Sequence, residues 1–200
     1  MIAVIDYGAG NIFSIVNALD YIGCKSVLTC DRSVIEEADS VILPGVGAFP
    51  EAMRRLGEAG LIDTIRAQAG QKPLLGICLG MQALFEKGCE FEETDGLGLV
   101  PGEVRRLDTG GLKLPHMGWN SVRIDKECEL TQGLRDGDML YFVHSYAART
   151  SDVYVSLSCE YGERFPALVH SGYVYGAQFH PEKSGPVGLR ILRSFAALKK

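Results

Sequence analysis

The chain has 200 residues, 46% of them hydrophobic, which suits one domain whose core needs neither disulfides nor metals. Its formal net charge is −5, and its basic residues are scattered apart from a Lys199–Lys200 pair at the end. The sequence therefore shows no basic cluster of the kind that binds nucleic acid, and a small-molecule substrate or a protein partner is favoured. We expect a single domain spanning residues 1–200.

No apolar run is long enough for a membrane span, and the start MIAVIDYG lacks the charged segment and cleavage site of a signal peptide. We expect a cytoplasmic protein that binds neither membranes nor nucleic acid. The six cysteines form no CxxC pair and have no histidine at zinc-finger spacing, so we expect reduced thiols, no metal and no cofactor. They are Cys24, Cys30, Cys78, Cys89, Cys128 and Cys159.

In the first half of the chain, short apolar runs alternate with helical patterns, which predicts a mostly parallel sheet covered by helices on both faces. A helix that Asn11 caps, and that Gly23 ends, follows the first strand. The predicted strands are Ile2–Ile5, Val27–Thr29, Ser40–Leu43 and Pro73–Ile77, and the other predicted helices are Ala48–Leu56, Leu61–Ala69 and Leu79–Glu86.

The second half has many strand patterns and few helical ones, so we expect it to add an antiparallel section to an α/β domain. A helix over Pro186–Leu198, with Val187, Ile191, Leu192 and Phe195 on one face, closes the chain. The predicted strands here are Val104–Leu107, Ser121–Ile124, Leu140–His144, Tyr154–Cys159, Ala167–Val169 and Tyr173–Phe179.

A cysteine lies at the junction between a predicted buried strand and the helix after it, in the sequence Gly76-Ile77-Cys78-Leu79-Gly80. This is the cysteine form of the nucleophile elbow, a sharp turn that leaves no room for side chains at its flanking glycines. The N–H groups at the start of the following helix favour the thiolate. An isolated cysteine is usually a core residue, but this context predicts that Cys78 is a nucleophile.

A histidine and a carboxylate lie just beyond the last predicted strand, in Phe179-His180-Pro181-Glu182. His180 can serve as the base and acid for a cysteine nucleophile, and Glu182 can orient its imidazole as the third member of a triad. Alone, this segment is equally compatible with an ordinary loop. The presence of the elbow in the same chain favours the triad Cys78–His180–Glu182.

The developing oxyanion needs donors, and the amide of Leu79, directly after the nucleophile, is one candidate. The turn Pro44-Gly45-Val46-Gly47 follows another predicted strand and can supply a second donor. A plain strand-to-helix loop also explains this turn, and the sequence leaves the choice open. If the turn supplies the donor, we expect an inactive resting conformation, because the flexibility of Gly45 and Gly47 makes a peptide flip inexpensive.

Several motifs together resemble the class I glutamine amidotransferases, and among them the glutaminase subunits of imidazole glycerol phosphate synthase. They are DYGAGN at residues 6–11, PGVGAF at 44–49, HMGWN at 116–120, FVHSY at 142–146 and FHPEKS at 179–184, besides the elbow. The resemblance implies hydrolysis of glutamine to glutamate and ammonia. It also implies a glutamine pocket lined by Gln82, Glu90, His144, Ser145 and Tyr146. For Gln82 the alternative is a polar helix residue, and for His144 a hydrogen-bonded core histidine.

Free ammonia would protonate and diffuse away, and the chain has no acceptor domain of its own, so a partner polypeptide is expected. The resemblance implies a cyclase subunit, a (β/α)₈ barrel, bound as a heterodimer in histidine biosynthesis. Asn11, Trp119, Tyr141 and Lys183 match family positions at that interface, although Lys183 is equally compatible with a solvated surface charge.

Three other functions are also compatible with the sequence. The chain can be a glutaminase that serves a different synthase, against which only the HMGWN and HPEKS segments argue. It can be a related cysteine hydrolase, such as a peptidase or deglycase, which Gln82 and the His180-x-Glu182 pair disfavour. It can also be a non-catalytic scaffold, against which the intact triad argues.

Overall fold

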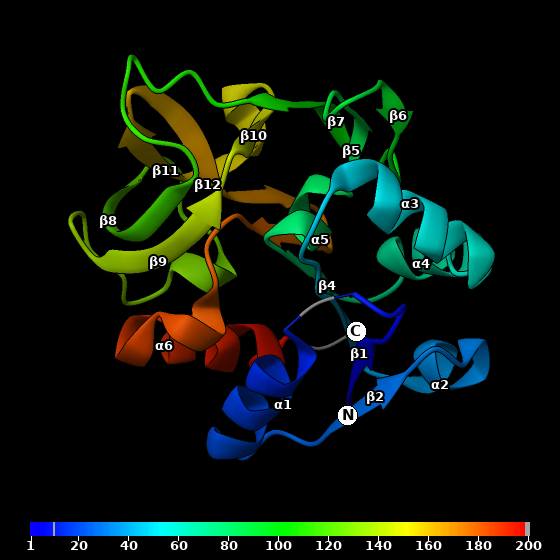
Figure 1. Cartoon of the computed structure of the whole chain (residues 1–200). Helices are drawn as coiled ribbons and strands as arrows, with labels where there is room; N and C mark the ends of the chain where they lie inside the picture. The colour runs from blue at the N-terminus through cyan, green and yellow to red at the C-terminus, as the bar shows by residue number, and fades with distance from the viewer. Residues whose placement is uncertain (10, 199–200) are drawn as a thin grey trace.

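The computed structural model describes residues 1–9 and 11–198, so Gly10 of the DYGAGN motif and the Lys199–Lys200 pair lie outside the described residues. Within that part, the strands form a nine-stranded sheet of order β2-β1-β3-β4-β13-β12-β11-β8-β9 and a four-stranded sheet of order β10-β7-β5-β6. Figure 1 shows that most helices lie beside the first strands in this nine-stranded order, and that few lie beside the last four strands, β12, β11, β8 and β9. The predicted α/β class, with helices on both sheet faces and an antiparallel section in the second half, is confirmed.

The first half of the large sheet is parallel. Its strands are β1 (Ile2–Ile5), β2 (Ser26–Thr29), β3 (Ser40–Leu43), β4 (Leu74–Ile77) and β13 (Val174–Ala177). Alternate side chains of β1 enter two separate hydrophobic cores. Ile2 and Val4 pack with α1 (Ile12–Tyr21) and α6 (Gly185–Ala197). Ala3 and Ile5 pack on the other face, with helices α2 (Arg32–Glu37), α3 (Phe49–Glu58) and α4 (Ile62–Ala69).

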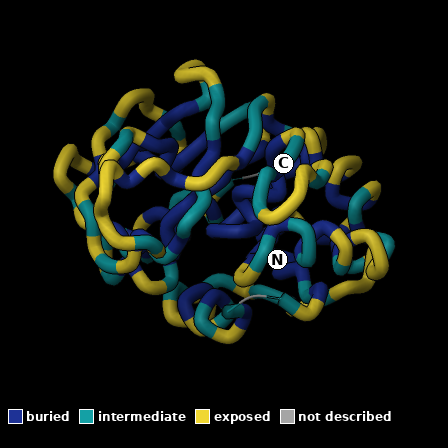
Figure 2. Tube along the Cα trace, turned by 45° about the horizontal axis from the view of Figure 1, so that its top comes forward, coloured by how far each residue is buried: buried dark blue, intermediate teal, exposed yellow. Residues whose placement is uncertain are grey.

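The second half of the large sheet is antiparallel. Its strands are β12 (Glu163–Ser171), β11 (Val155–Tyr161), β8 (His116–Ile124) and β9 (Met139–His144). Short 3₁₀ turns connect the elements: η1 (Glu129–Thr131), η2 (Asp152–Tyr154) and η3 (Pro181–Lys183). Figure 2 shows that the buried segments lie in the interior of the molecule and that exposed loops surround them.

Only one strand of the four-stranded sheet was predicted, at Val104–Leu107, and the sheet replaces part of a predicted helix. Its strands are β5 (Phe85–Gly88), β6 (Thr94–Asp95), β7 (Val100–Arg106) and β10 (Tyr146–Arg149). The helix expected over Leu79–Glu86 ends after one turn, as α5 (Leu79–Gln82). The carbonyls of Ala83 and Leu84 accept the N–H groups of Leu97 and Leu99 instead, at 2.8 Å each. Long-range pairing therefore overrides the local helical pattern.

Helix α2 was also not predicted, because its six residues are too few for a clear periodicity. The Asp31 carboxylate accepts the Ser33 N–H at its start, at 2.8 Å. At its end, the fully buried Lys72 donates to the carbonyls of Ile35, Glu36 and Ala38, at 3.1, 2.6 and 2.7 Å. A cation at this position satisfies carbonyls that the helix leaves unpaired.

None of the helices within residues 1–9 and 11–198 has the length and apolar character needed to cross a membrane. The helix predicted after Asn11 begins at Ile12, but the Asn11 side chain accepts the Ser14 hydroxyl, at 2.9 Å, rather than a backbone N–H.

Candidate active site

Cys78 lies in a tight turn between β4 and α5, with a φ of +55° that side-chain-bearing residues rarely adopt. The turn requires glycine on both sides. A Cβ on Gly76 would lie 2.5 Å from the Gly80 carbonyl oxygen, and one on Gly80 would lie 1.9 Å from the Leu43 carbonyl oxygen. This is the geometry of a nucleophile elbow, in which backbone strain is concentrated at the nucleophile. Because α5 is a single turn, its dipole supports the thiolate less than the longer predicted helix would.

His180 reaches Cys78 because β13 and β4 are parallel neighbours, with Ala177 opposite Ile77. The residues that follow the two strands leave the sheet at the same edge, and the Cys78 N–H donates to the Ala177 carbonyl at 2.7 Å. His180 Nδ1 lies 2.8 Å from Glu182 Oε1, and both side chains are almost completely buried. The structure thus brings together the three residues predicted as a triad.

The charge of its neighbours decides the protonation of His180. Burial alone would lower its pKa, but the adjacent Cys78 and Glu182 raise the pKa to about 9. The imidazole is therefore protonated at neutral pH and is stabilised between a sulfur and a carboxylate. Among the described side chains, Nε2 is one of the few buried polar atoms that form no hydrogen bond of ordinary geometry within the protein.

The backbone that carries His180 is fixed by Ser184, a residue to which the sequence argument assigned no role. The buried Ser184 hydroxyl accepts the Tyr141 N–H at 3.0 Å and donates to the His180 carbonyl at 2.6 Å. The His180 N–H donates in turn to the Tyr141 carbonyl at 2.9 Å. This closed arrangement attaches the loop that carries His180 to β9. Its sequence signal is the serine of FHPEKS, which a motif match alone does not explain.

A cavity of about 330 Å³ opens beside Cys78. Its size suits a small polar metabolite. All five residues predicted to bind glutamine line it, together with the predicted oxyanion residues other than Gly45. The lining consists of Val46, Gly47, Cys78, Leu79, Gln82, Glu90, Pro115, Val143, His144, Ser145, Tyr146 and His180.

Gln82 connects the cavity to Cys78 through a second glutamine, Gln178, for which no role was predicted. The Gln82 amide donates to the Tyr146 carbonyl at 2.8 Å and to Gln178 Oε1 at 3.0 Å. Gln178 Nε2 lies 3.9 Å from Cys78 Sγ, where its amide can donate to sulfur. Both glutamines are buried, so they position the cavity wall rather than act as polar residues of a surface helix.

His144 also lines the cavity, but other protein groups occupy both of its ring nitrogens. Nδ1 lies 2.9 Å from the Tyr146 carbonyl, so it carries the proton, and Nε2 lies 3.1 Å from His116 Nδ1 and accepts from it. The amide of Asn120 lies 3.3 Å from His116 Nε2 and completes the chain of donors. Burial lowers the pKa of His144 to about 3, helped by the neighbouring imidazoles and opposed by the hydrogen bond to the Tyr146 carbonyl. This geometry favours the alternative of a hydrogen-bonded core histidine.

Glu90 has a structural contact that the prediction did not include. One of its carboxylate oxygens accepts the Phe49 N–H at 2.8 Å, at the start of α3. A carboxylate there is stabilised by the N-terminal end of the helix. The side chain lines the cavity as well, where a carboxylate can pair with the ammonium group of an amino acid.

The turn at residues 44–47 is fixed at one end and open at the other. The buried Tyr7 hydroxyl donates to the Pro44 carbonyl at 2.9 Å, and a Cβ on Gly45 would lie 2.6 Å from the Gly80 nitrogen. Gly47 has a φ of +103° with free space around it, and Val46 is exposed. Burial and the neighbouring Cys78 hold the pKa of Tyr7 above its usual range, so its hydroxyl stays a donor.

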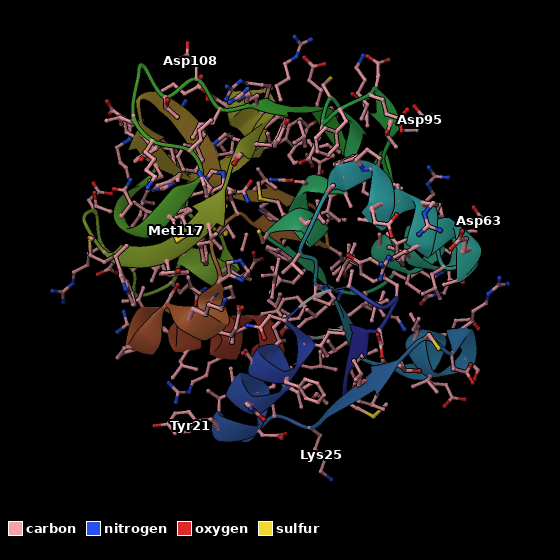
Figure 3. The ribbon with its side chains drawn as sticks, in the orientation of Figure 1. Tyr21, Lys25, Asp63, Asp95, Asp108 and Met117 are labelled. Atoms are coloured by element: carbon pink, nitrogen blue, oxygen red, sulfur yellow. The ribbon has the colours of Figure 1, made fainter. Side chains whose placement is uncertain are left out.

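Three of the four predicted interface residues lie together outside the triad. The rings of Trp119 and Tyr141 are 6.1 Å apart, and Lys183 Nζ lies 5.9 Å from the Tyr141 ring centre. Trp119 is 52% exposed, and Met117, two residues earlier on β8, is 63% exposed. Figure 3 shows where Met117 lies, on the β8–β9 side of the molecule. Asn11 lies at the start of α1, which packs against the turn that carries Lys183.

Comparisons with known proteins agree with this geometry. Residues 3–198 match the glutamine amidotransferase class-I family. A protein named imidazole glycerol phosphate synthase subunit HisH from Bacillus cereus is 52% identical, over 98% of this chain and 93% of its own length. One of the same name from Streptococcus gordonii is 51% identical, over 98% of this chain and 95% of its own length.

Solved structures share the fold at lower identity. A glutamine amidotransferase superposes with a TM-score of 0.76 at 21% identity, over 98% of this chain and 99% of that one. PurLQS from Thermotoga maritima superposes with a TM-score of 0.73 at 22% identity, over 97% of this chain and 96% of that one. Because the family match covers almost the whole chain and curated relatives share about half its residues, the chain belongs to the class I glutamine amidotransferases.

Proposed function

We propose that this chain hydrolyses glutamine to glutamate and ammonia with Cys78 as nucleophile, His180 as acid and base, and Glu182 as the residue that orients His180. The observation that carries the proposal is the His180–Glu182 pair beside a cysteine elbow, all at the wall of one cavity. Family membership and the names of the relatives support the same reaction.

In the first half of the reaction, the Cys78 thiolate attacks the side-chain amide carbon of glutamine. His180 gives its Nε2 proton to the departing nitrogen, so ammonia leaves and a γ-glutamyl thioester remains on Cys78. In the second half, His180 takes a proton from water, which attacks the thioester and releases glutamate. Proton transfers of this kind contribute about 10²–10⁴ to a rate. The raised pKa of His180 ensures that the proton needed in the first half is present.

The oxyanion of both tetrahedral intermediates would be held by the Leu79 N–H and by an N–H of the turn at residues 44–47. Each such donor is worth about 10²–10³ in rate. Gly47 is unconstrained by neighbours whereas Gly45 is held against the elbow, so a change in the turn would involve the Val46–Gly47 peptide. In our proposal the turn rests in an inactive conformation, which limits glutamine loss in the absence of a partner.

The ammonia would pass to a cyclase subunit, a (β/α)₈ barrel bound as a heterodimer partner in the cytoplasm. The complex would form imidazole glycerol phosphate and an aminoimidazole carboxamide ribotide in histidine biosynthesis. Relatives named as a subunit of imidazole glycerol phosphate synthase support this assignment. The exposed group of Trp119, Tyr141 and Lys183, with Asn11 nearby, is the surface that would contact the barrel.

The test measures glutamate release from glutamine by the chain alone, and then with the cyclase and its nucleotide ligand, with Cys78→Ser as the control in both. We expect strong stimulation by the liganded cyclase and none in the control. Hydrolysis that the cyclase leaves unchanged would retain the glutaminase but remove the assigned partner. No hydrolysis in either setting would refute the glutaminase itself.

Two alternatives predict different outcomes in the same assay. A glutaminase of another synthase would hydrolyse glutamine but ignore this cyclase, and a related peptidase or deglycase would not release glutamate from glutamine. The cavity of about 330 Å³ beside Cys78 suits one small polar substrate rather than an extended peptide.

A further inference from the structure

A second cysteine–histidine group lies far from Cys78. Cys128, Glu129 and His170 each offer one donor atom, and these three atoms lie within 4.8 Å of one another. Cys128 and Glu129 come from the start of η1, and His170 comes from the end of β12. Cys128 and His170 are partly buried and Glu129 is exposed, so the group is open to solvent at one side.

The outer contacts of this group are of the kind that metal-binding side chains make. His170 Nε2 lies 2.8 Å from the Gly172 carbonyl, so Nε2 carries the proton and the lone pair of Nδ1 is unused by that contact. The Tyr175 hydroxyl donates to one oxygen of Glu129 at 2.9 Å. The Tyr175 and His170 rings are also stacked, with centres 4.6 Å apart. Metal-binding histidines typically give their second N–H to a carbonyl, and metal-binding carboxylates are themselves hydrogen-bonded.

The donor set and the spacing favour zinc. A thiolate, an imidazole and a carboxylate suit Zn²⁺, whereas Mg²⁺ and Ca²⁺ prefer oxygen ligands alone. Ligands at the usual distances of about 2.0–2.3 Å around a tetrahedral ion are roughly 3.6 Å apart. Rotations of the side chains that move the three donor atoms by about 1 Å would therefore bring all of them within bonding distance of one ion. Glu129 and His170 also line two adjoining hollows of about 530 and 410 Å³, which leave space for a water as fourth ligand.

This group was not visible in the sequence because its members lie far apart along the chain. The pattern of cysteines and histidines led us to expect no metal, but the fold places His170 beside Cys128 and Glu129. The group lies at the start of β13, whereas His180 follows the end of the same strand, so the two sites occupy opposite edges of the parallel sheet.

We propose that Cys128, Glu129 and His170 form a binding site for one zinc ion that joins η1 to the turn between β12 and β13. Water completes the tetrahedral coordination, and the ion has a structural role that does not depend on the glutaminase reaction. Tyr175 and the Gly172 carbonyl orient two of the three ligands.

The experiment uses the full chain carrying Cys78→Ser, because the Cys78–His180 pair can itself bind a thiophilic metal. The protein is stripped with a chelator and titrated with Co²⁺, whose bond to a thiolate gives a near-ultraviolet charge-transfer band. We expect one Co²⁺ per chain, displaced by one Zn²⁺, and a higher Tm when Zn²⁺ is present. Adding Cys128→Ser should abolish the band, and His170→Gln should weaken Zn²⁺ binding at least tenfold. Tyr175→Phe, which removes an outer contact, should weaken it by about 10-fold or more.

The matched control is Cys30→Ser, which removes an exposed cysteine elsewhere and should leave Co²⁺ binding unchanged. Circular dichroism of each variant establishes that it is folded. His170→Gln changes a partly exposed residue, so it provides a second test if Cys128→Ser does not fold. A thiolate band that persists without Cys128, or Zn²⁺ binding that His170→Gln does not alter, would overturn the proposal. Absence of any thiolate band in the folded parent would overturn it as well.

Discussion

His180 and His144 line the same cavity and are both buried, yet their protonation states are opposite. The pKa of His180 is raised to about 9, and the pKa of His144 is lowered to about 3. Burial acts in the same direction on both, since it disfavours the charged imidazole. The difference arises from their partners. Negative groups flank His180, whereas a carbonyl and a neutral imidazole bind His144.

The two halves of the sheet supply these partners. At one edge of the parallel half, Cys78 of the elbow and the turn that carries His180 and Glu182 lie together. The two negative partners keep His180 protonated, so its imidazole can donate a proton. The antiparallel half pairs His116 on β8 with His144 on β9. Their two uncharged imidazoles form the neutral wall of the cavity. One cavity thus combines a reactive side, formed by Cys78, His180 and Glu182, and an inert side, formed by His144 and His116. Variants that alter a single partner of His180 or His144 should separate the roles of the two sides.

The largest effect should follow from Glu182→Gln. This change removes a carboxylate that raises the pKa of His180, so that pKa should fall while the pKa of His144 stays low. Glutamine hydrolysis should fall by about 10²–10⁴ in kcat, because the imidazole loses both its orientation and its proton. NMR titration of the four histidines, together with kinetics, measures both quantities, and His144 serves as the internal control. An unchanged pKa for His180 would show that Glu182 is not its electrostatic partner.

A smaller effect should follow from Ser184→Ala, which alters the position of His180 without altering its charged neighbours. Loss of the hydroxyl releases the His180 carbonyl and the Tyr141 N–H. We expect kcat to fall by about tenfold, less than the ~10² that a 1 Å misplacement can cost. The pKa of His180 should stay near 9, as measured by NMR, because Cys78 and Glu182 remain. A large fall in that pKa would mean that Ser184 maintains the charge pair rather than the backbone.

The alkaline limb of the pH dependence of hydrolysis should report the loss of the His180 proton. Cys78 and Glu182 are the titratable groups that act on it, and against the effect of burial they raise its pKa to about 9. Because the reaction needs the protonated imidazole, kcat/KM should fall about tenfold per pH unit above that value. The alkaline limb should move to lower pH in Glu182→Gln. A limb that stays in place in that variant would assign the ionisation to another group.

The reactive side was predictable from sequence and the inert side was not, for a physical reason. Glycine spacing around Cys78 is a local signal, and a histidine just after a parallel strand must leave the sheet at the same edge as the elbow. The neutrality of His144 depends on His116, whose position is set by the register of another strand. Ser184 and Gln178 act through long-range hydrogen bonds in the same way. Helix α5 was predicted too long because the pairing of Phe85 with Val100 is also non-local.

The smallest effect on catalysis should follow from His116→Phe, which acts only on the inert side. Phenylalanine can keep the stacking of residue 116 on Phe142 and Tyr161 but cannot donate to His144 Nε2. That nitrogen becomes an unsatisfied buried acceptor, so the free energy of unfolding should fall by about 1–3 kcal/mol. Urea denaturation measures this loss, and kcat should stay within about twofold, because general acid–base catalysis requires a proton transfer that a neutral wall does not make.

A double-mutant cycle with His144→Phe sharpens this last prediction. If the two imidazoles stabilise the fold through their mutual hydrogen bond, removing both should cost less than the sum of the single losses, with a coupling of about 0.5–3 kcal/mol. Additive losses would mean that each histidine acts through packing alone. A large fall in kcat for His116→Phe, with stability unchanged, would contradict the division of the cavity, because His144 would then take part in the proton transfers that we assign to His180.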